Sequence, residues 1–292
     1  MINKKDLDRI EALLNNKIIT DSKLLSDSFG INCIKVTIEN KLNLIVKYYK
    51  NVEENNFNAI KSEAQNLIYL NKLNLKSFPK VYSQNEDYLI MSFFDNNEIK
   101  PNYTKDDLLD SIISIHSLHN KEYGFDFDTQ IGGLRQKNTK MDNWVEYYKE
   151  LRLGYIFNLL NKENILDLSL SLKIEKLLNK LENYIPKNPR ASLLHGDLWE
   201  GNILFKNSNF VGFIDPGTFY GHNELEIAYL TWFNPDFIKN NFLEKYNNII
   251  ILDKEYKNYE PIYQLYYSLM NVYLWDRNYI KDSRRLIENI KN

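Results

Sequence analysis

The hydrophobic pattern of the chain changes near residue 94, and this change limits the possible folds more than any other feature of the sequence. Before that point, apolar residues alternate with polar ones, as at Ile34, Val36 and Ile38, which is typical of half-buried strands. After it, apolar residues recur mostly at helical spacing, as in residues 108–118. We therefore expect a small part that contains a sheet, followed by a larger and mainly helical part.

The predicted elements divide the chain into two lobes. In the first we expect helices at residues 3–16 and 53–73 and strands at 31–39, 42–49, 80–83 and 88–93. In the second we expect helices at 108–118, 141–160 and 168–184, further helices beyond residue 232, and a short β island at 193–194, 203–205 and 210–214. The prediction is an α+β fold with a β-rich N-lobe (1–94), a connector (95–103) and a larger helical C-lobe (104–292).

Composition and charge exclude several classes of protein. The 37 basic and 39 acidic residues give a net charge of -2 without a basic tract, so nucleic-acid binding is not expected. No apolar run approaches the roughly 18 residues of a membrane span, and residues 1–6 do not resemble a signal peptide. The single cysteine, Cys33, excludes an intrachain disulfide and a cysteine-built zinc site. We expect a cytoplasmic monomer or homodimer that does not enter a membrane.

The residues that carry chemistry lie on and beside the β island. The run from His195 to Asn202 (HGDLWEGN) precedes a predicted hairpin that ends at Asp215. This layout can bring two carboxylates and a carboxamide together, and such oxygen ligands suit Mg²⁺ bound with substrate phosphates. Their order also matches phosphoryl transfer, in which Asp197 would accept the proton of the attacking hydroxyl while Asn202 and Asp215 would hold metal.

A kinase site also needs a lysine for the nucleotide phosphates and a glutamate that orients it. Lys47 lies near the end of the second predicted strand, and Glu63 lies in the helix that follows. We expect the phosphate-covering turn within residues 26–33, where Gly30 is the one glycine and Cys33 would lie close to the nucleotide. Cys33 is either a small half-buried residue or a redox-sensitive thiol that blocks the turn or links two chains.

With these residues in place, the sequence resembles the fructosamine kinases (ketosamine-3-kinases), which are related to the aminoglycoside and choline kinases. The resemblance runs from about residue 26 to residue 230 and becomes patchier beyond it. It is carried by residues 195–202 and 215–224, and by the shorter stretches 123–126, 131–134, 142–144 and 152–153. The run from Phe219 to His222 (FYGH) is more particular to this family than the His-Gly-Asp motif, which the whole superfamily shares.

The resemblance implies a bilobal, protein-kinase-like fold and an enzyme that uses ATP and Mg²⁺. The family phosphorylates the 3-hydroxyl of a ketosamine sugar, free or protein-bound, and the unstable product then releases the amine. Carried over residue by residue, Asp197 becomes the base, Asn202 and Asp215 the metal ligands, and Lys47 and Glu63 the phosphate pair.

On the substrate side, the resemblance places His195, His222 and Trp199, whose ring either stacks on the sugar or has a purely structural role. Four features depart from the family pattern. The turn at residues 26–33 has fewer glycines than usual, and Gly154-Tyr155 replaces the usual Pro-Gln after Leu153. In addition, Glu200 replaces a usually small residue, and Gly217 stands where alanine is usual. Because none of them belongs to the transfer machinery, we expect them to affect the choice of substrate.

Three other hypotheses about the function compete with that of a ketosamine kinase. The first is a kinase of another small hydroxyl compound, such as an aminoglycoside, choline or a free sugar. The second is a catalytically silent nucleotide-binding module, which we would expect to have lost at least one of the five transfer residues. The third is a metallohydrolase built on His195, Asp197, Asp215 and His222, which lacks closely paired histidine ligands and would not need Lys47 and Glu63.

Overall fold

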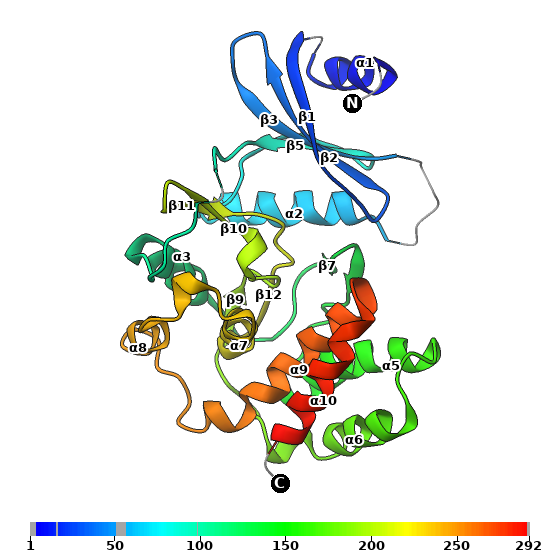
Figure 1. Cartoon of the computed structure of the whole chain (residues 1–292), viewed down its shortest axis with the longest axis vertical. Helices are drawn as coiled ribbons and strands as arrows, with labels where there is room; N and C mark the ends of the chain where they lie inside the picture. Colours follow the sequence, from blue (N-terminus) through cyan, green and yellow to red (C-terminus); the bar gives the residue numbers. More distant parts are fainter. Residues whose placement is uncertain (1–3, 16, 51–56, 98, 291–292) are drawn as a thin grey trace.

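The chain folds into two lobes that follow one another along the long axis of the molecule (Figure 1). The computed structural model describes residues 4–15, 17–50, 57–97 and 99–290. The N-lobe contains two helices and a five-stranded antiparallel sheet in the order β1-β2-β3-β5-β4. Its elements are α1 (Lys4–Leu13), β1 (Ile19–Ser28), β2 (Ile31–Ile38), β3 (Asn43–Tyr49), α2 (Ala59–Lys72), β4 (Val81–Gln84) and β5 (Tyr88–Ser92).

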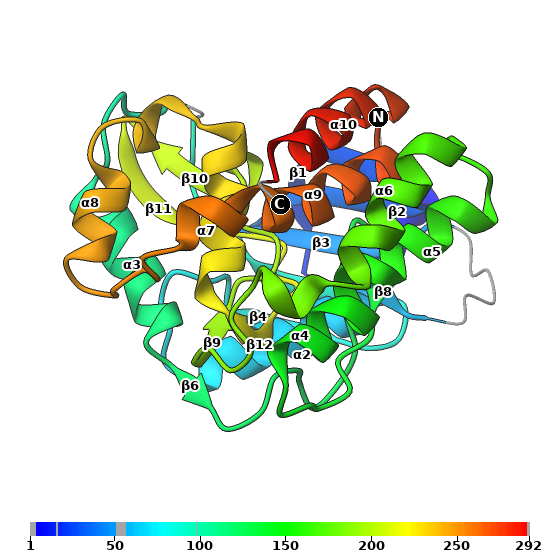
Figure 2. The same ribbon diagram turned by 90° about the horizontal axis from the view of Figure 1, so that it is seen from below.

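The C-lobe is mainly helical and contains three small sheets, β12-β9-β6, β10-β11 and β7-β8. Its helices are α3 (Asp106–His116), α4 (Trp144–Tyr148), α5 (Gly154–Lys162), α6 (Leu168–Leu178), α7 (Asn223–Phe233), α8 (Phe242–Asn247), α9 (Tyr256–Leu274) and α10 (Ile280–Asn289). Its strands are β6 (His119–Asn120), β7 (Thr129–Ile131), β8 (Leu134–Gln136), β9 (Ala191–Leu194), β10 (Ile203–Lys206), β11 (Asn209–Phe213) and β12 (Phe219–His222). Figure 2 shows α9 crossing the middle of this lobe between α7 and α5. Within the described ranges, none of the helices combines the length and the apolar character that crossing a membrane requires.

Alternation along β3 assigns its side chains to two covered faces of the N-lobe sheet. Val46 belongs to a buried cluster with Ile10 of α1. Ile45 points the other way and belongs to a cluster with Leu67 of α2. Because side chains two positions apart share a face, Lys47 lies on the α2 side, which is also the side that faces the C-lobe.

The predicted α+β architecture is confirmed, and the differences have local causes. Strand β1 is missed because most of its side chains are polar and exposed, as an edge strand with a single neighbour allows. Helix α2 begins at Ala59, where the Asn58 side chain accepts the backbone N–H of Lys61 as an N-cap. Residues 53–56 of the predicted helix lie outside the described residues.

The β island contains two strands that the sequence pattern does not predict, β6 and β12, which pair with β9 on its two sides. Strand β12 pairs antiparallel with β9, and Phe219 lies opposite Leu194. This pairing brings the loop that leaves β9 next to the loop that enters β12. The first loop carries Asp197 and the second carries Asp215, so the C-lobe topology itself brings the two predicted carboxylates together.

Candidate active site

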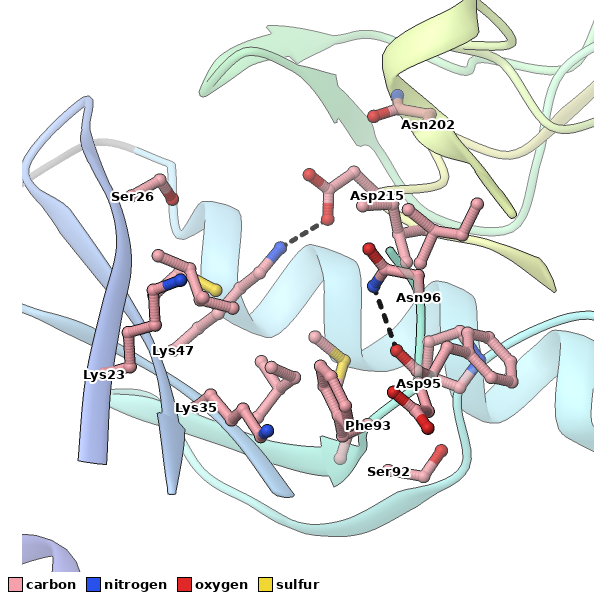
Figure 3. Close-up of a pocket in the computed structure, with 18 of the residues that line it drawn as sticks. Lys23, Ser26, Lys35, Lys47, Ser92, Phe93, Asp95, Asn96, Asn202 and Asp215 are labelled. Atoms are coloured by element: carbon pink, nitrogen blue, oxygen red, sulfur yellow. Dashed lines mark hydrogen bonds and ion pairs between the residues drawn. The ribbon is translucent and has the colours of Figure 1, made fainter. Parts of the chain in front are cut away.

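A cleft of about 680 Å³ lies between the two lobes. Its N-lobe wall comes from residues 23–26 of β1, from β2 and from β3, and its edge comes from residues 92–97 at the start of the connector. The C-lobe supplies the floor through residues 201–204 and 214–215. Lys47, Asn202 and Asp215 therefore all line one cavity (Figure 3).

Lys47 is the cation at the centre of this cleft. Its Nζ donates to the Glu63 carboxylate at 2.7 and 2.8 Å and to Oδ1 of Asp215 at 2.6 Å. Burial alone would lower the pKa of Lys47, but the carboxylates of Asp215 and Glu63 outweigh burial and raise it well above its ordinary value. The predicted contact between Lys47 and Glu63 is thus formed, and the lysine is a permanent positive charge beside Asp215.

Asp215 reaches the cleft from a strained turn. It follows β11 with a φ of +56°, a left-handed conformation that is uncommon for a residue other than glycine. Two backbone bonds hold the turn: the N–H of Ile214 donates to the Asn202 carbonyl at 3.1 Å, and that of Gly217 donates to the His195 carbonyl at 2.9 Å. Because backbone strain of this kind persists only where the surroundings enforce it, the turn indicates a functional position for the carboxylate.

Asp197 and Asn202 are joined directly on the C-lobe side. The Asn202 amide nitrogen donates to Oδ2 of Asp197 at 3.0 Å and to its carbonyl oxygen at 2.9 Å. Figure 3 shows the amide oxygen of Asn202 on the side of Asp215. Burial raises the pKa of Asp197 to about 7, and the charge of Asp215 adds to this effect. Asp197 therefore titrates near neutral pH, as suits a general base.

The oxygen donors fit a hard cation such as Mg²⁺. Asp215 offers a carboxylate at the cleft, Asn202 offers an amide oxygen once its nitrogen is bound to Asp197, and both line the same cavity. Within the described residues, no group of three or more histidine, cysteine or acidic side chains is arranged to hold a metal. The set is therefore suited to an ion that takes its remaining ligands from phosphate and water.

Glu226 holds the Asp197 loop in place, and the sequence analysis missed it. This fully buried carboxylate on α7 accepts the backbone N–H groups of His195 at 2.9 Å and Gly196 at 2.7 Å. It also pairs with Nε2 of His116 at 2.9 Å. Burial would raise the pKa of Glu226, but its bond and charge interaction with His116 lower it. The available signal was an acidic residue within the otherwise apolar run from Leu225 to Leu230.

The expectation that His195 contacts substrate is corrected. Its ring is fully buried and stacked on Phe78. Nδ1 accepts the backbone N–H of Asp197 at 3.2 Å, so Nε2 carries the proton and donates it to the Ile214 carbonyl at 2.9 Å. His195 therefore connects the loop of Asp197 with the turn of Asp215 from within the protein interior, and it has no exposed surface that a substrate could contact.

His222 is corrected in the same way. It lies at the end of β12 farthest from the Asp197 loop, because it pairs with Ala191 at the start of β9. Its Nδ1 contacts the Tyr263 hydroxyl at 2.9 Å, and burial lowers its pKa to about 3. The side chain borders a separate C-lobe cavity together with Glu224, not the cleft that contains Asp215.

The two residues predicted on the nucleotide turn differ in position. Cys33 lies opposite Lys47 in the β2–β3 register and lines the cleft. Burial raises the pKa of its thiol to about 11, so little reactive thiolate is present at neutral pH. Gly30 lies at the tip of the β1–β2 turn and does not line the cleft. The part of β1 that lines the cleft is residues 23–26.

Trp199 lies two residues after Asp197 and is partly buried. Its ring packs on Phe233 of α7, with a centroid distance of 5.6 Å. It also covers Gly201 so closely that a Cβ there would lie 2.4 Å from the ring. The neighbouring Glu200 pairs with Lys100 at 3.4 Å, so its extra charge is turned toward the connector.

The arrangement is that of a phosphotransferase, and comparison with known proteins agrees. The family model of fructosamine kinase matches residues 16–292. A probable ketoamine kinase of Pasteurella multocida is 26% identical over 235 residues, which cover 79% of this chain and 80% of that protein. The chloroplastic protein-ribulosamine 3-kinase of Arabidopsis thaliana is 29% identical over 208 residues, 69% of this chain and 61% of that protein.

Solved structures agree on the fold. A crystal structure assigned as a fructosamine-3-kinase of Thermobifida fusca superposes with a TM-score of 0.85 at 22% identity, and covers 97% of each chain. The streptomycin–ATP complex of the aminoglycoside phosphotransferase APH(2″)-IIa superposes with a TM-score of 0.63 at 16% identity, over 99% of this chain and 97% of the other. The expected bilobal, protein-kinase-like fold is thereby confirmed.

Proposed function

Because the chain belongs to the fructosamine kinase family, we propose that it transfers the γ-phosphoryl group of ATP to the 3-hydroxyl of a ketosamine, with Mg²⁺ at the site. The observation that carries this proposal is that Lys47, Asn202 and Asp215 line one cleft, while Glu63 contacts Lys47 and Asp197 contacts Asn202. Lys47 and Glu63 come from the N-lobe, and Asp197, Asn202 and Asp215 come from two C-lobe loops. Phosphoryl transfer depends on such placement, because the enzyme acts mainly by positioning and by charge stabilisation.

Each group has a definite role in this proposal. Asp197 accepts the proton of the attacking sugar hydroxyl, and its pKa of about 7 lets it hold that proton at neutral pH. Lys47 stays charged and binds the nucleotide phosphates, while Glu63 fixes its ammonium group. Asp215 and Asn202 would hold the Mg²⁺, which neutralises phosphate charge when bound.

The proposed acceptor site lies beside Asp197, where Trp199 offers an aromatic face to the apolar face of a sugar. A phosphate ester on the 3-hydroxyl makes the ketosamine unstable, so that the amine is released and the overall result is deglycation. The amine of the proposed ketosamine is either a free molecule or part of a protein. The relatives named as ketoamine and ribulosamine kinases support a ketosamine as the substrate class.

The test is Mg²⁺-dependent ATP consumption with fructosyl-lysine, ribulosyl-lysine, kanamycin, choline and free ribose. We expect turnover with the ketosamines alone, and we expect Asp197→Asn to lower kcat by about 10²–10⁴-fold, the usual scale for loss of a general base. Turnover confined to kanamycin or choline would refute the substrate class and keep the transfer site. Near wild-type turnover in Asp197→Asn would refute the role of this carboxylate.

A further inference from the structure

The turn between β1 and β2 carries a conformational anomaly. Its two central residues, Phe29 and Gly30, have φ values of +52° and +75°. Two consecutive positive φ values define a type I′ hairpin turn, for which Asn-Gly is the preferred pair. A bulky side chain at the first of these positions is strained, and such strain is retained where it serves a function.

The Phe29 ring is used in a contact between the lobes. It packs edge to face on Trp275, which follows the C-terminal end of α9, with a centroid distance of 4.9 Å and an interplanar angle of 73°. Both residues nevertheless remain substantially exposed, at 43% for Phe29 and 56% for Trp275. The contact therefore joins two surface aromatic residues instead of extending the core of either lobe.

The turn between β7 and β8 provides the rest of the socket. Its residues Gly132 and Gly133 have φ values of +51° and +78°. A Cβ on Gly133 would lie 3.2 Å from the Cβ of Phe29, and one on Gly132 would lie 3.4 Å from the edge of the Phe29 ring. The Gly-Gly pair, which has no role in the chemistry proposed above, thus makes room for this ring.

The socket is connected to the catalytic loops. On β7, the Thr129 hydroxyl donates to the Gly217 carbonyl at 3.2 Å, two residues after Asp215. The Gln130 carbonyl approaches Gly217 so closely that a Cβ there would lie 2.4 Å away. On the other side of Phe29, residues 23–26 of β1 line the nucleotide cleft. The ring therefore connects the strand that covers the cleft with the hairpin that supports the Asp215 turn.

We infer that Phe29 is a positioning residue for the nucleotide, held in a socket of Trp275 and the Gly132–Gly133 turn. It fixes the distance between β1 and the turn that carries Asp215. The walls of the cleft are therefore already in position when ATP binds. The inference rests on the proposed function insofar as the cleft is taken to bind ATP.

The test exploits the strain at the turn. Phe29→Asn creates the preferred Asn-Gly pair, so it removes the ring while it favours the hairpin. We expect the Kd for Mg²⁺–ATP, measured by titration calorimetry, to rise about 2–10-fold, the range expected for loss of one aromatic pair. We expect the thermal midpoint of unfolding to stay equal or to rise, since the turn is relieved of strain.

The matched control is Leu42→Asn. Leu42 lies by the β2–β3 turn at the other end of the same sheet, is 40% exposed, and is not a cleft residue. We expect it to leave the Kd unchanged. Trp275→Leu should weaken ATP binding as Phe29→Asn does, and the double variant should be no weaker than either single variant, because both remove the same contact.

A Kd within 1.5-fold of wild type in Phe29→Asn would overturn the inference, and so would effects of Phe29→Asn and Trp275→Leu that multiply in the double variant. Calorimetry needs no acceptor, so the result is separate from the fate of the substrate proposal. Wild-type protein that binds ATP but phosphorylates no ketosamine would refute the substrate class and leave the socket testable. Wild-type protein that does not bind ATP at all would refute both.

Discussion

Replacing Glu226 with glutamine tests whether the Asp197 loop is held from α7. The native carboxylate accepts three donors, which are two backbone N–H groups and one imidazole N–H. A glutamine keeps one oxygen and turns its NH₂ group toward at least one of these donors. A buried donor left without an acceptor costs about 1–3 kcal/mol, so the free energy of unfolding should fall by that amount. At about 2–4 °C per kcal/mol for a chain of this size, the thermal midpoint should fall by about 2–12 °C.

The effect on catalysis should be larger than this loss of stability suggests. The orphaned donors belong to His195 and Gly196, which immediately precede Asp197, so the loop must shift to find new acceptors. Since a displacement of about 1 Å in a catalytic group can reduce the rate 10²-fold, we expect kcat at saturating ATP and ketosamine to fall about 10–100-fold.

Glu224→Gln is the matched control for this experiment. Glu224 lies two residues earlier on α7 and is also buried, but it accepts from the Tyr259 hydroxyl and the Asp253 backbone N–H, away from the cleft. We expect a change in stability with kcat within about twofold of wild type. If Glu226→Gln kept kcat within twofold, or lost no more activity than Glu224→Gln, the assignment of Glu226 as the support of the loop would be wrong.

The charges of the site give three further predictions. The kcat/KM for ATP should rise with pH up to about 7 and then level off, because Asp197 must lose its proton to act as a base. The same raised pKa of Asp197 should make the folded protein more stable at low pH. This contribution is fully present below the ordinary carboxyl pKa of 3.8 and is lost as pH rises through about 7. The free energy of unfolding measured against pH should therefore fall over this window in the wild type and fall less in Asp197→Asn. Lys47→Met should destabilise the protein by about 3–5 kcal/mol in denaturant unfolding at pH 7, because Glu63 loses its buried partner, and by less at pH 5, where Glu63 can take up a proton. The exposed pair of Lys61 and Glu86 supplies the control Lys61→Met, for which we expect a change below about 0.5 kcal/mol.

Much of the site was predictable because its members lie at ends of elements with strong local patterns. Lys47 was found from the alternation of a strand, and Asp215 from the end of a hairpin whose turn residues, Asn207 and Ser208, have the positive φ values that a two-residue hairpin turn requires. Local periodicity is a property of neighbouring residues, so a single sequence can reveal it. The convergence of Asp197 with Asp215 was then expected from their order along the chain.

What was missed depends on partners far away in the sequence. Glu226 acts through residues 30 and 31 positions before it. The strand β1 is recognised only once its partner β2 is known, because its own side chains are mostly polar. His195 and His222 were placed with the substrate on the strength of motif letters, but a motif does not distinguish a side chain that faces a ligand from one that holds the backbone.

Two of the contacts that join the lobes differ in their physical nature. The Lys47–Asp215 pair is electrostatic, and the Asp215 side chain is 40% exposed, so salt and bound phosphate can compete for it. The contact of Phe29 with Trp275 is apolar and does not respond to the charge of the nucleotide. In the proposed reaction, phosphates would draw Lys47 away from Asp215, and the electrostatic link between the lobes would weaken at the moment when Asp215 must be available as the proposed metal ligand. The aromatic contact is unaffected by that exchange, so it can keep β1 in place above the Asp215 turn while the charges rearrange.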